Sequence, residues 1–234
     1  LRQSDYDEPR QWPSVAIIFA AKDEQREIEQ AVCSMLKVEY PNLKYIAVND
    51  RSTDQTGNIL DRLAAKDERL KVVHVQELPD GWLGKNNALQ QAAVATDTDY
   101  LLFTDADVSF DPECVKRAIG YTEHHGVDHL TMFPKVPMPG LLLNAFVVFF
   151  FKTFVLYYRA WRVSNPKSKA FLGIGAFNLV RNQAFREVGG FARIPMEVVD
   201  DLWLGKLMKQ GGFRQHVLIA RDDLSVPWYG SIRE

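Results

Sequence analysis

The chain has 234 residues, of which 47% are hydrophobic, 25% are charged and 12% are aromatic. This length suits one α/β domain, and the near-average composition excludes a disordered, collagenous or coiled-coil chain. The only cysteines are Cys33 and Cys114, which excludes a disulfide framework and a cysteine-rich zinc module and favours a reducing, intracellular setting.

Short apolar runs alternate with helix-like patterns in the first half of the chain. We predict strands at 15–20, 45–48, 70–75 and 100–104. We predict helices at 24–37 and 85–95. A third helix is expected to run from a cap at Ser52 or Asp54 to about Ala65, and a fourth from a cap at Asp111 to Glu123. Continuous apolar strands that alternate with helices are typical of an α/β fold whose mostly parallel sheet is covered on both faces. In such sheets ligands bind at the carboxyl ends of the strands, so the polar residues that follow each strand are the first site candidates.

Charge is unevenly distributed along the chain, although the formal net charge is only −2. Residues 129–186 contain eight Lys or Arg and no Asp or Glu, so the remainder of the chain has a net charge of −10. This asymmetry favours an anionic partner on one face, either a phosphate-bearing ligand or a membrane surface. Chance segregation of surface charge is the alternative.

The segment Leu141–Trp161 is strongly apolar and aromatic. Its longest uninterrupted apolar run, 145–151, is too short to span a bilayer, which needs roughly 20 apolar residues. On a helical wheel, four polar positions fall within an arc of about 80°: Asn144, Lys152, Arg159 and Arg162. We expect a helix in a membrane interface, with this cationic stripe toward anionic headgroups, and a buried core helix is the alternative.

Three Asp-x-Asp triplets occur in the chain, and only their position separates them. Asp105 and Asp107 directly follow an apolar strand, where a parallel sheet presents its ligands. Paired carboxylates at this place favour a hard divalent cation that bridges to a diphosphate. Helix capping is the alternative role, although Asp111 before Pro112 is the better cap.

Two further groups of residues are candidates for a site. Lys85 lies at a glycine-bearing loop that opens a helix, where backbone amides and a cation favour phosphate, and an exposed first-turn lysine is the alternative. Asp200 and Asp201 precede a short amphipathic helix at 202–209, where they serve as caps or place a general base in the cleft. Neither a P-loop nor a G-x-G-x-x-G pattern occurs, which counts against a dinucleotide-binding dehydrogenase.

In combination, these positions resemble glycosyltransferase family 2, which has the GT-A fold, from Val15 to about Pro227. The resemblance rests on VAIIFAAKDE at 15–24, YPN at 40–42, VNDRSTDQT at 48–56, GKNNAL at 84–89, DAD at 105–107 and VDD at 199–201. Within the family, GWLGK at 81–85 and FLGIGAF at 171–177 most resemble hopanoid-associated glycosyltransferases and next ceramide glucosyltransferases, which handle lipids at membranes. Two departures stand out: Asp200 replaces the usual Glu, and the downstream Q/R-x-x-R-W motif is not intact at 228–234.

The resemblance implies a metal-dependent, inverting hexosyltransferase. Its donor is expected to be a nucleotide sugar, with a UDP-sugar favoured. Its acceptor is expected to be a lipid hydroxyl, as in a hopanoid or a sphingolipid-like molecule. By resemblance, Asp201 is the catalytic base, Asp200 lies behind it or on the acceptor side, and Asp107 holds Mg²⁺ or Mn²⁺ with help from Asp105. The residues implied in donor binding are Ala20, Glu24, Asp50, Lys85 and Asp105.

We expect one catalytic domain over 1–234, with a nucleotide-sugar half at about 13–110 and an acceptor and base half at about 111–228. The chain starts at Leu1 without an initiator methionine, and we expect an excerpt of a longer membrane protein that works at the cytoplasmic face of a membrane. The expected partners are the nucleotide sugar, the lipid acceptor and a membrane surface that contacts the Leu141–Trp161 region, without nucleic acid.

Two rival functions remain open. A sugar nucleotidyltransferase shares the nucleotide-binding sheet and the metal carboxylates, but its first loop is normally rich in glycine and contains arginine, whereas this chain has FAAKDE at 19–24. The other rival is a non-catalytic domain that binds nucleotide or lipid. The released product separates the three functions: nucleoside diphosphate, pyrophosphate or none.

Overall fold

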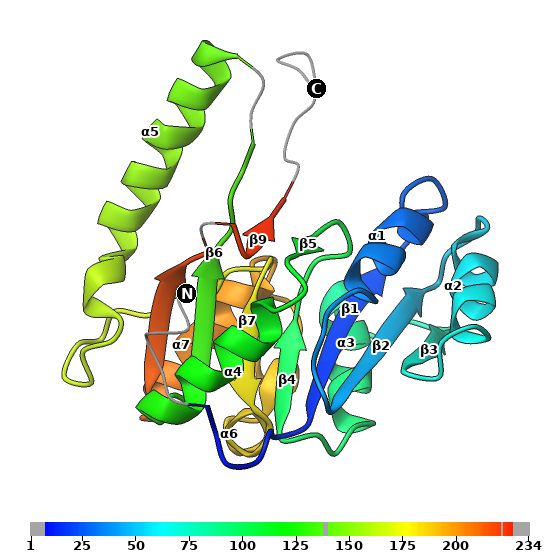
Figure 1. Cartoon of the computed structure of the whole chain (residues 1–234), viewed down its shortest axis with the longest axis horizontal. Helices are drawn as coiled ribbons and strands as arrows, with labels where there is room; N and C mark the ends of the chain where they lie inside the picture. Colours follow the sequence, from blue (N-terminus) through cyan, green and yellow to red (C-terminus); the bar gives the residue numbers. More distant parts are fainter. Residues whose placement is uncertain (1–7, 138–139, 221, 227–234) are drawn as a thin grey trace.

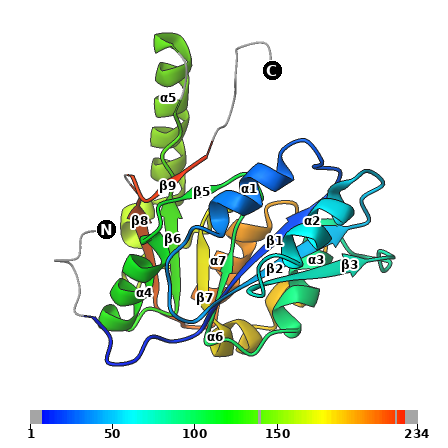
Figure 2. The same cartoon turned by 45° about the vertical axis from the view of Figure 1, so that its right-hand side comes forward.

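The computed structural model describes residues 8–137, 140–220 and 222–226. A seven-stranded sheet with the order β3-β2-β1-β4-β7-β6-β8 forms its centre (Figures 1 and 2). The strands of this sheet are β1 Val15–Ala21, β2 Leu43–Asp50, β3 Leu70–Val75, β4 Tyr100–Phe103, β6 His129–Phe133, β7 Asn178–Arg181 and β8 Gln215–Ile219. A separate pair consists of β5 Ser109–Phe110 and β9 Leu224–Ser225.

Helices flank the sheet on both sides. They are α1 Ile28–Met35, α2 Thr56–Ala64, α3 Gly84–Val94, α4 Cys114–His125, α5 Leu141–Tyr158, α6 Asn182–Glu187 and α7 Asp200–Gln210, with the short 3₁₀ turns η2 Ala160–Arg162 and η3 Gly190–Arg193. Helices α1, α2 and α4 pack on one face, and α3, α6 and α7 pack on the other. Only α5 projects away from the sheet (Figure 1).

Strand direction confirms the predicted α/β fold with a mostly parallel sheet. Strands β1 to β4 are mutually parallel, and β8 is parallel to β6. Strand β7 is antiparallel to both β4 and β6, and its first residue, Asn178, pairs with Phe103 at the end of β4. The residues before β7, rather than those after it, therefore lie at the carboxyl edge where ligands are expected.

The first strand shows why the apolar runs of the sequence are continuous. Val15, Ile17 and Phe19 point into one apolar layer, while Ala16 and Ile18 point into the other, and all five are 0% exposed. Because side chains alternate between the faces of a strand, a sheet covered on both faces needs apolar residues at every position.

The first helix is shorter than the predicted 24–37. It starts at Ile28, and the preceding residues form a loop in which the backbone amides of Glu24 and Gln25 donate to Thr56 Oγ1 at 2.8 Å and to Asp54 Oδ2 at 3.1 Å. These bonds hold the loop after β1 against the loop after β2. The part of the sequence that most resembles the family thus joins two of the loops at the carboxyl edge.

Helix ends differ from the predictions in smaller ways. Of the two predicted caps of α2, Asp54 accepts from the Thr56 amide at 2.9 Å at the helix start, whereas Ser52 accepts from the amide of Asp23 in the neighbouring loop. Helix α7 begins two residues before the predicted 202, so both aspartates lie in its first turn. The stretch 228–234, where the departure from the family motif falls, lies outside the described residues.

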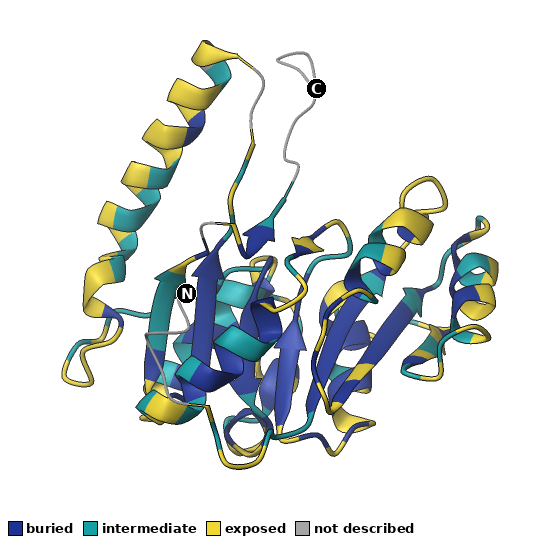
Figure 3. Cartoon of the chain, viewed as in Figure 1, coloured by how far each residue is buried: buried dark blue, intermediate teal, exposed yellow. Residues whose placement is uncertain are grey.

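Helix α5 corrects three predictions. Most of its side chains are exposed, with Phe149 at 69% and Tyr157 at 78%, so the alternative of a buried core helix is wrong (Figure 3). The cationic stripe does not continue along one helix, because Arg159 has a left-handed φ of 51° that ends α5, and Arg162 lies in η2. By length and composition alone, the 20 residues 143–162 are long and apolar enough to cross a membrane, although the uninterrupted run in the sequence suggested otherwise.

Candidate functional site

Loops from several elements meet at the carboxyl edge of the parallel strands and enclose a cavity of about 640 Å³. Helix α1 forms one wall, and the loops after β1 and β4 and the start of α3 form the others. Five of the residues predicted from the sequence line it: Ala20, Glu24, Lys85, Asp105 and Asp107. We call this space the acidic cavity, and its volume suits a ligand of nucleotide size.

Lys85 connects the acidic cavity to the first turn of α7. Its Nζ lies 2.7 Å from Asp105 Oδ1 and 3.4 Å from Asp200 Oδ1. Burial lowers the pKa of Lys85, but the charges of Asp200 and Asp105 raise it by more, so its pKa lies above the usual value. The lysine therefore stays charged and joins the Asp-x-Asp loop to the predicted base region.

The pKa values of the two aspartates in the first turn of α7 are both raised. Burial raises the pKa of Asp200 against the opposing effect of Lys85. Burial, and then the charge of Asp200, raises the pKa of Asp201 to about 6, although the Leu202 amide donates to Asp201 Oδ1 at 2.7 Å. A carboxylate with a pKa near neutral pH that is still ionised at pH 7 suits a general base.

The glycines of the segment that precedes β7 allow the acidic groups to come together. A Cβ atom on Gly173 would lie 1.8 Å from the carbonyl oxygen of Asp201, and one on Gly175 would lie 2.7 Å from Asp105 Oδ2. Only glycine permits a backbone to approach so closely. The 171–177 segment therefore lies between the Asp-x-Asp loop and α7 and sets their separation, a role that its Gly-x-Gly pattern alone did not reveal.

A buried polar chain supports α7 from below, and sequence reasoning missed it. Gln215 Nε2 donates to His129 Nδ1, so the His129 proton is on Nε2 and is donated to Asn178 Oδ1. Asn178 Nδ2 then donates to the backbone carbonyl of Asp201 at 3.4 Å. Burial lowers the pKa of His129 to about 4, so the ring is neutral at pH 7. Nothing local in the sequence marks these residues, because they come from three separate strands.

Asp50 does not line the acidic cavity. Its carboxylate accepts hydrogen bonds from Arg51 Nε at 2.8 Å and Nη2 at 3.0 Å, and the residue is 4% exposed. It contacts the turn that carries Lys85, since a Cβ atom on Gly84 would lie 2.3 Å from Asp50 Oδ2. Asp50 therefore lies beside the site, and its contact with a nucleoside stays a prediction.

The acidic residues fit a divalent cation that is shared with a ligand. Burial and the charge of Asp105 raise the pKa of Asp107, and burial, Glu27 and Asp107 raise that of Glu24, which indicates repulsion that a cation would relieve. No cluster of three or more His, Cys, Asp or Glu suited to a metal exists among the described residues. Mg²⁺ is commonly held by one or two carboxylates and substrate phosphates, so Asp105 and Asp107 suffice only with a phosphate-bearing ligand.

A second cavity, of about 240 Å³, adjoins the acidic cavity at Asp105. Apart from that carboxylate its lining is apolar, with Phe150, Phe151 and Phe154 from α5 facing Phe133 at the end of β6. Phe133 and Phe151 have ring centroids 5.0 Å apart, which ties α5 to the sheet. We call this space the apolar groove. It offers a hydrocarbon surface that ends at an acidic site residue.

Two solved structures have the same fold. The mannosyltransferase PcManGT from Pyrobaculum calidifontis, in complex with GDP-Man and Mn²⁺, matches with a TM-score of 0.72 and 18% identity over 97% of this chain and 61% of that chain. Staphylococcus aureus TarS 1–349, in complex with UDP-GlcNAc, matches with a TM-score of 0.61 and 19% identity over 93% of this chain and 59% of that chain. At these identities the likeness defines the fold, which is that of the GT-A glycosyltransferases.

The family is shown by the sequence match. The model of glycosyl transferase family 2 matches residues 16–189, and the chain belongs to that family. The chain is 32% identical over 112 residues to beta-monoglucosyldiacylglycerol synthase of Synechocystis sp., covering 47% of this chain and 23% of that protein. It is 34% identical over 98 residues to 4,4'-diaponeurosporenoate glycosyltransferase of Staphylococcus aureus, covering 42% of this chain and 24% of that protein. The matches thus span about a quarter of each relative.

Proposed function

We propose that this chain transfers a hexose, with inversion and with the help of a divalent cation, from a nucleotide sugar to a hydroxyl group of a lipid at a membrane surface. One observation carries the proposal. Lys85 contacts both Asp105 and Asp200, so the residues suited to a leaving diphosphate and those suited to base catalysis form one continuous site.

The donor half of the proposal concerns the acidic cavity. Asp105 and Asp107 would hold Mg²⁺ or Mn²⁺, which stabilises the negative charge of the departing diphosphate. Lys85 presents a second positive charge to the phosphates. Ala20 and Glu24 contact the nucleoside, for which UDP is the favoured carrier. The GDP-Man and UDP-GlcNAc bound by the two structural neighbours support a nucleotide-sugar donor without naming the base.

The catalytic half concerns α7. Asp201 takes the proton of the acceptor hydroxyl as its oxygen attacks the anomeric carbon, while the bond from that carbon to the phosphate oxygen breaks on the opposite face. The products are a glycoside of inverted configuration and a nucleoside diphosphate. Asp200 holds Lys85 in place beside the leaving group. A positioned general base of this kind contributes about 10²–10⁴-fold to the rate.

The apolar groove supports a lipid as the acceptor. Its phenylalanine lining would contact a ring system or an acyl chain, and Asp105 at its end marks where the polar head would meet the donor. The relatives named for glucosyldiacylglycerol and diaponeurosporenoate support the same class of acceptor. A hopanoid or a sphingolipid-like acceptor stays a prediction. We further propose that the halves at about 13–110 and 111–228 form one catalytic domain at the cytoplasmic face of a membrane.

A donor screen tests this function. The chain is incubated with nucleotide sugars and a lipid hydroxyl acceptor, and the release of nucleoside diphosphate is measured. Asp201→Asn removes the base but keeps the shape, so we expect a loss of about 10²–10⁴-fold in transfer with nearly unchanged nucleotide affinity. Asp97→Asn is the matched control, because the Asp97 side chain is 95% exposed and lies in another Asp-x-Asp triplet.

Each other outcome selects a rival. Release of pyrophosphate would identify a sugar nucleotidyltransferase, and nucleotide binding without turnover of any donor would identify a non-catalytic binding domain. Normal turnover by Asp201→Asn would remove Asp201 from the mechanism.

A further inference from the structure

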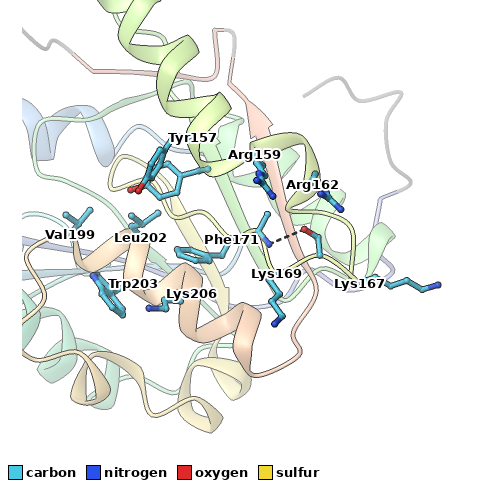
Figure 4. Close-up of a pocket in the computed structure, with 13 residues that line it drawn as sticks. Tyr157, Arg159, Arg162, Lys167, Lys169, Phe171, Val199, Leu202, Trp203 and Lys206 are labelled. Atoms are coloured by element: carbon cyan, nitrogen blue, oxygen red, sulfur yellow. Dashed lines mark hydrogen bonds between the residues drawn. The ribbon is translucent and has the colours of Figure 1, made fainter.

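A cavity lies at the foot of α5, between η2, the following loop and α7 (Figure 4). Its volume is about 700 Å³. Five cationic side chains line it: Arg159, Arg162, Lys167, Lys169 and Lys206. We call it the basic pocket. Tyr157, Tyr158, Phe171 and Trp203 add aromatic surface to the same walls.

The positive charge of the basic pocket has no acidic partner among the residues that the structure describes. Its lining contains no Asp or Glu, and none of its five cations forms an ion pair with a residue in the described part of the chain. By contrast, Lys85 in the acidic cavity contacts two aspartates. Like charges that line one cavity repel one another, so an anion that enters it gains attraction from all of them.

Internal contacts give the basic pocket a defined shape. Lys209 Nζ donates to the carbonyl oxygens of Val163 at 2.6 Å and Asn165 at 3.0 Å, which fastens the loop after η2 to α7. Val163 is itself fully buried. Lys206 Nζ lies 3.7 Å from the centroid of the Trp203 ring, in a cation–π contact on one wall. These contacts fix the backbone of the loop after η2 and the side chain of Lys206, so they define two walls of the pocket. The other four cations lie on exposed residues at its rim.

The surroundings of the basic pocket are those of a membrane boundary. Beside it, α5 exposes a long row of apolar side chains, and Trp161 in η2 is 62% exposed. Met196 and Val198, in the loop that leads into α7, are 58% and 81% exposed. Aromatic and basic side chains next to exposed apolar surface are typical of the interface between hydrocarbon and headgroups.

We propose that the basic pocket binds the phosphate of an anionic phospholipid headgroup while the exposed apolar surface of α5 enters the hydrocarbon of the same bilayer. This site goes beyond the proposed function, because it would hold a lipid that is not the acceptor. Val199 and Leu202, which flank the two aspartates of α7, also line the basic pocket. The bound lipid would therefore bring the catalytic base to the membrane surface.

Vesicle flotation tests the site with a matched pair of triple variants. Arg162→Gln, Lys167→Gln and Lys169→Gln remove three exposed cations of the basic pocket. The control variant removes three exposed cations elsewhere: Lys37→Gln, Lys44→Gln and Lys71→Gln. Lys44 and Lys71 lie near the amino ends of β2 and β3, at the opposite edge of the sheet. Both variants lose the same charge, so they differ only in where it was.

The vesicles contain phosphatidylcholine alone or phosphatidylcholine mixed with phosphatidylglycerol. We expect the wild type to prefer the anionic vesicles. A cation near such a surface contributes about fivefold to binding, so the pocket variant should lose roughly a hundredfold and the control variant far less. Equal losses in the two variants would mean nonspecific attraction and would overturn the proposal, as would unchanged binding by the pocket variant.

Two further measurements separate the remaining explanations. If inorganic phosphate protects the pocket lysines from acetylation while anionic vesicles do not, the site takes soluble phosphate and the lipid proposal fails. Release of nucleoside diphosphate is measured on the same samples. Vesicle binding that does not depend on the pocket cations, together with normal turnover, would overturn this inference alone. Pocket-dependent vesicle binding without turnover of any donor would overturn the proposed transferase and leave the pocket assignment standing.

Discussion

The acidic cavity and the basic pocket are both connected to the start of α7, but their charges are paired differently. The acidic cavity is connected to it through the contact of Lys85 with Asp200, and the basic pocket is lined by Val199 and Leu202. In the acidic cavity, Lys85 forms ion pairs with Asp105 and Asp200, so the protein neutralises part of its own charge. In the basic pocket, five cations line one space without an acidic partner among the described residues. An acidic cavity accepts a diphosphate only together with a cation, whereas a basic pocket can take an anion directly.

Substitution at Asp107 tests whether the acidic cavity needs a cation, and among the tests that compare the two regions it should have the largest effect. In the wild type, nucleoside diphosphate should bind more tightly when Mn²⁺ is present. In Asp107→Asn, the affinity for nucleoside diphosphate in the presence of Mn²⁺ should fall by more than about a hundredfold. The reason is that loss of a residue that only hydrogen-bonds to a metal ligand already lowers metal affinity by about 10–100-fold. Isothermal titration calorimetry with and without Mn²⁺ measures it, and Asp97→Asn is the control. Equal wild-type affinity under both conditions would contradict the metal role.

The pH dependence should separate the two regions by about tenfold. Asp201 must be a carboxylate to accept a proton, and its pKa is raised to about 6, so transfer should fall as the pH drops through 6 and be about tenfold below its plateau at pH 5. Vesicle binding by the basic pocket should stay constant over this range, because arginine and lysine side chains keep their charge. A profile of kcat/KM that stays flat to pH 5 would exclude Asp201 as the base.

The buried chain below α7 should give the smallest effect. Asn178→Ala removes the donor to the Asp201 carbonyl and leaves His129 without an acceptor, which costs about 1–3 kcal/mol of unfolding free energy. If Asn178 positions the base, kcat should also fall several-fold with an unchanged KM for the donor.

Asn182→Ala is the matched control for Asn178→Ala. Asn182 is also a buried amide, but it bonds to the Thr98 carbonyl at 2.7 Å, away from the site. It should cost similar stability and leave kcat and its pH profile unchanged. Equal effects of the two variants on kcat would mean that Asn178 contributes to stability and does not position Asp201.

Much of the acidic cavity was predictable because its signals are local. Asp105 and Asp107 follow directly after an apolar strand, Lys85 opens a helix, and Glu24 follows the first strand, and all line the predicted space. These positions could be assigned because the residues that follow each strand of a parallel sheet lie at the same edge of that sheet. Even there, the predicted first helix is too long, because the residues before Ile28 form a loop that is bonded to the loop after β2.

The basic pocket and the buried contacts to Asp201 were not predictable in this way. The sequence shows the cations of 159–169 as a run of positive charge and predicts a straight helix through Arg162. The left-handed Arg159 instead turns the chain, and these cations line a cavity together with Lys206 of α7. The approach of Gly173 to Asp201 depends on an antiparallel β7, which no local pattern indicated.

The amino-acid sequence by itself determined the parallel sheet, the candidate residues at the ends of its strands and the family resemblance, because these depend on burial periodicity and on short motifs. Only the tertiary structure decided that Lys85 joins Asp105 to Asp200, and that the exposed helix α5 ends beside a pocket whose cations have no acidic partner in the described part of the chain. The physical reason is distance along the chain. Charge pairing and close backbone approach act over a few ångströms in space, and residues far apart in sequence meet only after the whole sheet has assembled.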